Sequence, residues 1–138
     1  MSLDNLVHIG KLKAEPPAQA EMNGLIRSGK ARLADAENES LSVDGRFDLA
    51  YNAAHALSLA ALRWHGYRSE NRYLVFQTLP HTLGLANEQW RVLDQAHRKR
   101  NQVEYEGVVD VDESFVQAMM RVTRDIAARV EKLGPVRE

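Results

Sequence analysis

Hydrophobic residues recur at intervals of three and four along most of the chain, which is the period of an amphipathic helix. The pattern predicts a short first helix that ends before Pro16, followed by five longer helical segments. These are expected over residues 18–37, 46–65, 70–83, 87–106 and 110–133. The hydrophobic pattern therefore predicts an all-α bundle of five or six helices, in a single domain over residues 1–138.

The predicted helix over residues 46–65 has apolar residues on more than one face, which is typical of a central helix packed on several sides. Its many alanines would let neighbouring helices approach closely. Asp44 is expected to cap its N-terminus, and Gly66 is expected to end it. In the segment over residues 70–83, Pro80 lacks an amide donor and is expected to kink or split the helix.

The last two predicted helices have distinct core faces and ends. The helix that begins at Asn87 is expected to end at Gly107 and to bury the apolar residues Trp90, Leu93, Ala96 and Val103. The acidic run that begins at Asp110 is expected to cap the final helix. On that helix, Met119 and Met120 fit core positions better than an interface.

The composition is that of an ordinary globular protein, with 44% hydrophobic and 27% charged residues. A formal net charge of −1 gives no global basic field, so any contact with nucleic acid must come from a local patch. The absence of cysteine excludes disulfides, thiolate metal sites and a cysteine nucleophile. No apolar run is long enough to cross a bilayer, and the N-terminus lacks a signal-peptide pattern, so we expect a cytoplasmic protein with no membrane partner.

The best candidate for function is the stretch over residues 98–107, RKRNQVEYEG, near the end of a predicted helix. Residues four apart on a helix face each other, so Arg100 should lie beside Glu104, and Asn101 beside Tyr105. Asparagine is a poor residue for a helix interior, which favours a functional or interface cluster. The structural alternative is that Arg100 pairs with Glu104 while Tyr105 covers the core.

Other polar residues give weaker signals. The five histidines form no pair at the spacing of a helical metal site, so no metal and no cofactor are expected. Asp94 and His97 are three residues apart, which fits a surface ion pair better than a metal motif. His55 lies in an apolar helix and is expected to be a core histidine with its hydrogen bonds satisfied.

Two segments of the chain resemble the HEPN superfamily, a group of small helical proteins linked to prokaryotic nucleotidyltransferases, toxin–antitoxin systems and RNA cleavage. One is the alanine-rich helix with its exit turn, over residues 50–68, and the other is HRKRNQVEYE, over residues 97–106. The resemblance implies an antiparallel bundle of four main helices plus one or two short ones, and commonly a homodimer.

In the ribonuclease members of that superfamily, an Arg that is usually followed by a polar residue such as Asn precedes a His by four to six positions. Two such motifs meet in a cleft at the dimer interface, and cleavage is thought to need no metal. Arg100 and Asn101 match this motif, but Tyr105 stands at the expected place of the His. An unperturbed tyrosine has a pKa near 10 and is a poor base at neutral pH, whereas a histidine titrates in that range.

The resemblance leads to three hypotheses. In the first, the protein is a binding or regulatory module, a homodimer whose cleft binds nucleic acid, a nucleotide, or a nucleotidyltransferase or antitoxin partner. Arg100, Asn101 and Tyr105 would line that cleft, beside the binding residues His97, Arg98 and Glu104. In the second, the protein is a metal-independent ribonuclease that uses Arg100 with Tyr105 or His97. In the third, the cluster only specifies dimer packing.

Overall fold

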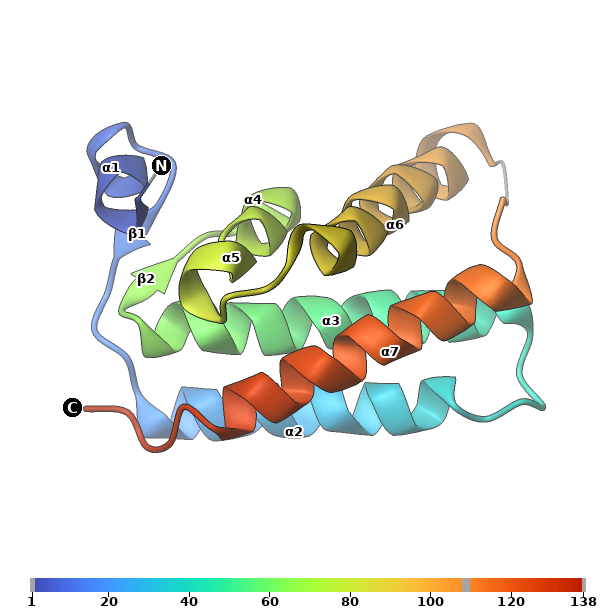
Figure 1. Cartoon of the computed structure of the whole chain (residues 1–138), viewed down its shortest axis with the longest axis horizontal. Helices are drawn as coiled ribbons and strands as arrows, with labels where there is room; N and C mark the ends of the chain where they lie inside the picture. Colours follow the sequence, from blue (N-terminus) through green and yellow to red (C-terminus); the bar gives the residue numbers. More distant parts are fainter. Residues whose placement is uncertain (1, 108–109, 138) are drawn as a thin grey trace.

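The computed structural model describes residues 2–107 and 110–137 and shows a helical bundle, which confirms the predicted all-α class (Figure 1). The described residues form four long helices: α2 (Gln19–Ala36), α3 (Val43–Trp64), α6 (Asn87–Glu106) and α7 (Glu113–Glu131). The shorter helices are α1 (Leu3–His8), α4 (Arg72–Gln77) and α5 (Leu79–Thr82). None of the described helices is both long enough and apolar enough to cross a membrane.

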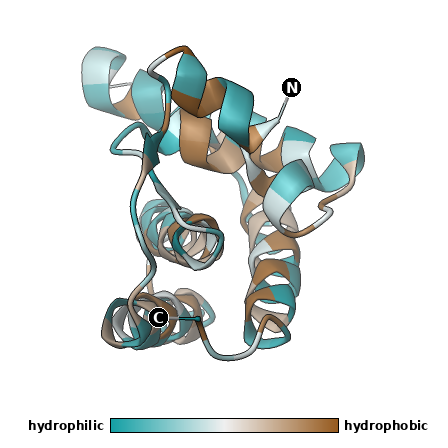
Figure 2. Cartoon of the chain, turned by 90° about the vertical axis from the view of Figure 1, so that its left-hand side faces the viewer, coloured by the Kyte–Doolittle hydropathy of each residue, from teal (hydrophilic) through white to brown (hydrophobic). Residues whose placement is uncertain are grey.

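Helix α3 is the centre of the bundle. It lies between α2 on one side and the layer of α4, α5 and α6 on the other, while α7 runs across the front of the bundle (Figure 1). Seen end-on, the helices turn many of their hydrophobic residues towards one another (Figure 2). This position explains why α3 is apolar on more than one face, as its sequence predicted.

Small residues bring α2 and α3 close together. Ala50, Ala53, Ala54, Ala60 and Ala61 of α3 are all fully buried. A Cβ atom added to Gly29 of α2 would lie only 2.6 Å from Cγ of Leu57. The two helices could not keep this separation with a larger residue at position 29, because real Cβ atoms do not approach other carbons so closely.

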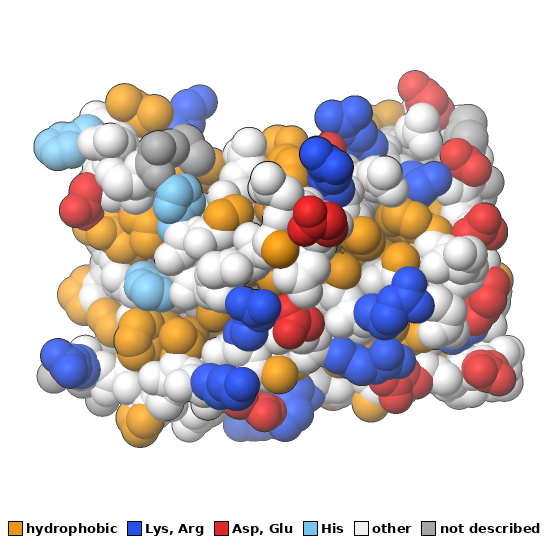
Figure 3. Space-filling view, in the orientation of Figure 1, with side chains coloured by type: hydrophobic (Ala, Val, Ile, Leu, Met, Phe, Trp, Pro, Cys, Tyr) orange, Lys and Arg blue, Asp and Glu red, His pale blue; other side chains and the backbone are white. Residues whose placement is uncertain are grey.

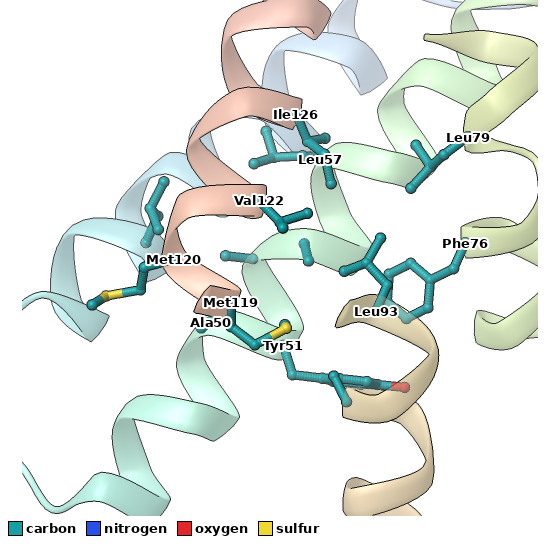
Figure 4. Packing of buried hydrophobic residues seen from close by; sticks show 14 of the residues in the cluster. Ala50, Tyr51, Leu57, Phe76, Leu79, Leu93, Met119, Met120, Val122 and Ile126 are labelled. Atoms are coloured by element: carbon teal, nitrogen blue, oxygen red, sulfur yellow. The ribbon is translucent and has the colours of Figure 1, made fainter. Parts of the chain in front are cut away.

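The core continues from α3 to α7 and α6. Met119 and Met120 of α7 are buried, as predicted, and pack with Val122 and Ile126 in the same cluster (Figure 4). On α6, Leu93 and Ala96 are fully buried, but Val103 is 39% exposed, so its assignment to the core face was wrong. Its exposure reflects its position on the last turns of α6, towards the end of the bundle.

The start of α3 differs from the predicted one, whereas its end and the break at Pro80 agree with the prediction. Ser42, not Asp44, caps α3: its Oγ accepts a hydrogen bond from the amide of Gly45 at 3.0 Å, so α3 begins at Val43, three residues earlier than predicted. Pro80 does mark a break, since α4 ends at Gln77 and α5 begins at Leu79. Gly66 follows the end of α3 with φ of +90°, as its capping role requires.

A short antiparallel ladder, absent from the sequence-based prediction, ties the N-terminal segment to α3. Its strands are β1 (Lys13–Ala14) and β2 (Tyr67–Arg68). Beneath it, the guanidinium of Arg63 is only 2% exposed and donates to Oε1 of Glu21 at 2.5 Å and to the carbonyl of Pro16 at 2.7 Å. The buried charge is therefore paired and hydrogen-bonded, as burial of an arginine demands.

Candidate functional site

Helices α3 and α6 are joined by a chain of polar side chains in the middle of an apolar region. Tyr51 of α3 is 1% exposed, and its ring reaches towards α6 near Leu93 and Phe76 (Figure 4). Its hydroxyl lies 3.1 Å from Nδ1 of His97, and Nε2 of His97 lies 3.3 Å from the amide nitrogen of Asn101. We call these residues the Tyr51–His97–Asn101 chain.

The geometry of the Tyr51–His97–Asn101 chain indicates that the imidazole of His97 is neutral. The side-chain nitrogen of Asn101 can only donate, so Nε2 of His97 accepts and Nδ1 carries the proton donated to the oxygen of Tyr51. Burial lowers the pKa of His97, an effect that the nearby carboxylate of Asp94 partly offsets. Burial also raises the pKa of Tyr51, which keeps the phenol protonated.

Two guanidinium groups converge on Tyr51. The guanidinium carbon of Arg100 lies 4.9 Å from the centroid of the Tyr51 ring, and that of Arg72, on the first turn of α4, lies 5.8 Å from it. Arg100 forms an ion pair with Oδ1 of Asp48 at 2.5 Å. Within the described ranges, Arg72 has no ion pair with a carboxylate, and its guanidinium donates to Oδ1 of Asn52 at 3.1 Å.

A second polar group lies beside this one on α6. Asp94 accepts a hydrogen bond from the hydroxyl of Tyr73 at 2.8 Å and pairs with Arg98 at 3.3 Å. The hydrogen bond to Asp94 is the main reason why the pKa of Tyr73 is raised. The predicted ion pair between Asp94 and His97 is therefore wrong, because each residue has other partners. The ring of Tyr73 packs on His97, with centroids 4.8 Å apart.

The residues singled out in the RKRNQVEYEG stretch separate into two groups. Arg100 contacts Asp48 and the ring of Tyr51 on α3. Asn101 contacts His97, which in turn contacts the hydroxyl of Tyr51. Tyr105 is 81% exposed on the last turn of α6, so it neither covers the core nor pairs with Asn101, which bonds to His97 instead. Arg100 pairs with Asp48 across to α3, and among the described residues no ion pair joins it to Glu104.

A cavity of about 390 Å³ lies next to Arg100, between the first turns of α3 and the last turns of α6. Its walls include the apolar side chains of Phe47, Val103 and Val111, and its polar residues are Asp44, Asp48, Arg100 and Glu104. Figure 3 shows acidic side chains along the right-hand edge of the molecule, the end at which α6 finishes and α7 begins. Among the described residues that line the cavity, Arg100 is the one basic residue beside three carboxylates.

Four residues of α3 that shape the site were not predicted to belong to it. Asp48, Tyr51, Asn52 and His55 are spaced at three, one and three, so they lie on one face of a helix whose neighbouring positions are alanine and leucine. A polar stripe in an apolar helix was the signal that would have found them. Arg72 gave no such signal, because only the fold brings α4 against α3.

His55 departs from its expected role as a satisfied core histidine. Its Nε2 atom is buried and has no hydrogen-bond partner among the described residues. Burial, reinforced by the nearby charge of Arg72, lowers the pKa of His55 to about 4. The imidazole is therefore neutral at physiological pH, and its ring packs edge-on against Phe76 with centroids 6.3 Å apart.

The described residues contain no cluster of three or more histidine, aspartate or glutamate side chains arranged to hold a metal ion. No protein-family model matches the chain, and no curated protein sequence matches it. What the site can do is therefore inferred from its own side chains. Paired arginines are suited to phosphate oxygens, because the planar guanidinium offers two parallel N–H donors.

Proposed function

We propose that the protein is a HEPN-like binding module whose α3–α4–α6 surface holds a phosphate group of RNA or of a nucleotide. The observation that carries this proposal is the convergence of Arg72 and Arg100 on the ring of Tyr51, at 5.8 and 4.9 Å. Two like charges held near one ring repel each other unless an anion lies between or beside them. Asp48 neutralises Arg100, whereas no carboxylate of the described residues pairs with Arg72, whose polar partners are the amide oxygen of Asn52 and the hydroxyl of Tyr51.

The polar chain behind the arginines supports a preorganised site. Tyr51 is fixed by burial and by His97, so the aromatic surface on which both guanidiniums pack has little freedom to move. Arginine loses less conformational entropy on binding when its guanidinium is already stacked. A phosphate would therefore meet two arginines that are already held in place.

The partner and the oligomeric state implied by the resemblance stay predictions. A nucleotidyltransferase or antitoxin partner and a homodimer are both part of the proposal. The side chains of Val103 and Tyr105, exposed on the last turns of α6, are where we expect a second copy to pack.

The test is binding of a fluorescein-labelled single-stranded RNA of 12 nucleotides, followed by fluorescence anisotropy, with ATP as a competitor. We expect Arg72→Gln and Arg100→Gln each to weaken binding by about 10-fold or more, as loss of a charge-assisted hydrogen bond implies. Arg27→Gln is the matched control, because Arg27 is exposed on α2, on the far side of α3. Competition by ATP at similar concentration would favour a nucleotide ligand, and its failure would favour RNA. Equal binding by all four proteins would refute the proposal.

A metal-independent ribonuclease is the second candidate, and the position of His97 favours it. A neutral imidazole lies one helical turn before Arg100 and Asn101, and histidine is the side chain that most often acts as a general base. The binding function ranks first because Asn101 would have to leave Nε2 of His97 before that atom could accept a proton. Cleavage of RNA in the presence of a chelator, lost in His97→Gln and kept in Tyr105→Phe, would establish the ribonuclease.

A further inference from the structure

The two arginines of the proposed site are linked by an internal hydrogen-bonded bridge. Arg100 donates to Oδ1 of Asp48, and the amide nitrogen of Asn52 lies 3.4 Å from Oδ2 of the same carboxylate. Arg72 then donates to Oδ1 of Asn52 at 3.1 Å. Asp48 and Asn52 are one turn apart on α3, so the helix holds both at a fixed spacing. We call this the Arg100–Asp48–Asn52–Arg72 bridge.

From this arrangement we infer that Asp48 is an internal competitor, a carboxylate that occupies the phosphate-binding donors of Arg100 until a ligand displaces it. The inference rests on the proposed function. A carboxylate and a phosphate present the same kind of oxygen pair to a guanidinium, so Asp48 takes the place that a ligand phosphate would fill. The bridge thereby keeps both arginines oriented in the absence of ligand.

The exposure of the pair allows this exchange. The side chain of Asp48 is 60% exposed, and that of Arg100 is 25% exposed, so a ligand can reach the contact from solvent. Ion pairs this exposed are weak, because water screens them and solvates the released carboxylate. Asp48 also retains a partner after displacement, because the amide of Asn52 already donates to its backbone carbonyl at 2.9 Å and lies near its carboxylate.

The contrast with the buried salt bridges of Arg63 supports this role. The side chain of Arg63 is only 2% exposed, so its guanidinium offers almost no surface to a ligand from solvent. Arg100 instead meets a single carboxylate at the surface and shares the ring of Tyr51 with a second arginine, Arg72. Between Arg63 and Arg100, only Arg100 is placed so that an external anion can displace its carboxylate partner.

The experiment is a double-mutant cycle on the affinity for the same labelled RNA. We expect Asp48→Asn to tighten binding roughly two- to five-fold, which is the range that removal of an exposed competing ion pair implies. In the Arg100→Gln background the same substitution should leave the affinity unchanged, because the competed donors are gone. Glu70→Gln is the matched control, since Glu70 is an exposed carboxylate two residues before Arg72 and forms no salt bridge with a described residue. We expect Glu70→Gln to change affinity less than two-fold.

Each other result has a definite meaning. Weaker binding by Asp48→Asn would overturn the inference and make Asp48 a residue that positions Arg100. Tightening that persists in the Arg100→Gln background, or that Glu70→Gln reproduces, would also overturn it, because the effect would then be one of overall charge. If Arg100→Gln alone binds as well as wild type, the proposed function itself fails, and this result is distinguishable because it does not involve position 48.

Discussion

Substitution of Gly29 by alanine tests the close packing of α2 on α3, and Gly24 supplies the control within the same helix. Both glycines lie inside α2 (Gln19–Ala36), and neither has a positive φ. An added Cβ at Gly24 would meet nothing within 4 Å. At Gly29 it would lie 2.6 Å from Cγ and 2.9 Å from Cδ2 of Leu57, and 3.3 Å from the carbonyl oxygen of Ala53.

The two variants should therefore move stability in opposite directions. Alanine in place of glycine within a helix gains about 1 kcal/mol of helix propensity, which applies at both positions. At position 29 the gain is opposed by overpacking, which costs about 1–3 kcal/mol when a core cannot yield. Leu57 is fully buried, so its side chain has little room to move away. We expect Gly24→Ala to stabilise the protein by up to about 1 kcal/mol and Gly29→Ala to destabilise it by about 1–2 kcal/mol.

The assay is urea unfolding followed by circular dichroism at 222 nm, with the free energy of unfolding compared at equal slopes. A third variant, Leu57→Ala, removes Cγ and Cδ2, the two atoms that lie within 3 Å of the new Cβ, and leaves only the 3.3 Å contact with the carbonyl oxygen of Ala53. In the double variant Gly29→Ala/Leu57→Ala, the substitution at position 29 should again be stabilising. A Gly29→Ala variant that is as stable as Gly24→Ala in the presence of Leu57 would refute the close approach of α2 and α3.

Two further predictions concern the buried side chains of Arg63 and His55. Arg63→Met should lower the free energy of unfolding by about 3–5 kcal/mol, because it leaves Glu21 and several carbonyls without their buried partner. Arg68→Met should lower it by only about 1 kcal/mol, because the side chain of Arg68 is 30% exposed. Equal losses in urea unfolding would contradict this. The pKa of His55 is about 4 in the folded protein and about 6.5 when unfolded, so below pH 6.5 only the unfolded chain takes up a proton. The free energy of unfolding should therefore fall as pH is lowered from 6.5 towards 4, by up to about 3 kcal/mol, and His55→Leu should flatten this dependence; an unchanged slope would show that His55 is solvated.

The helices could be predicted from the sequence because their signals are local. The hydrophobic spacing of α2, the glycine after α3 and the proline near the α4–α5 break act within a few residues. The cap of α3 was misplaced because Ser42 and Asp44 are both good capping residues, and only the backbone conformation selects between them. The β1–β2 ladder joins residues more than 50 positions apart, and two-residue strands carry no period.

The candidate site was predicted only in part, for a related reason. The RKRNQVEYEG stretch drew attention to Arg100 and Asn101 because their spacing on α6 is visible in sequence. Their partners Tyr51, Asp48 and Arg72 come from α3 and α4, and the pairing of helix faces is set by packing. The i, i+4 spacing predicted a contact between Arg100 and Glu104. Arg100 instead forms its ion pair with Asp48 on the neighbouring helix α3. Tertiary contacts thus replaced the local ones.

The most direct test of the phosphate-binding surface is an NMR titration of ¹⁵N-labelled wild-type protein with the unlabelled 12-nucleotide RNA. The arginine side-chain Nε–H signals report each guanidinium separately. The signals of Arg72 and Arg100 are assigned by their disappearance in Arg72→Gln and Arg100→Gln. The account predicts that these two signals shift first and together, along with the backbone amides around Tyr51 and His97, while the signal of Arg27 on α2 stays in place. Shifts confined to α2 and α7, or spread evenly over all the arginines, would contradict it.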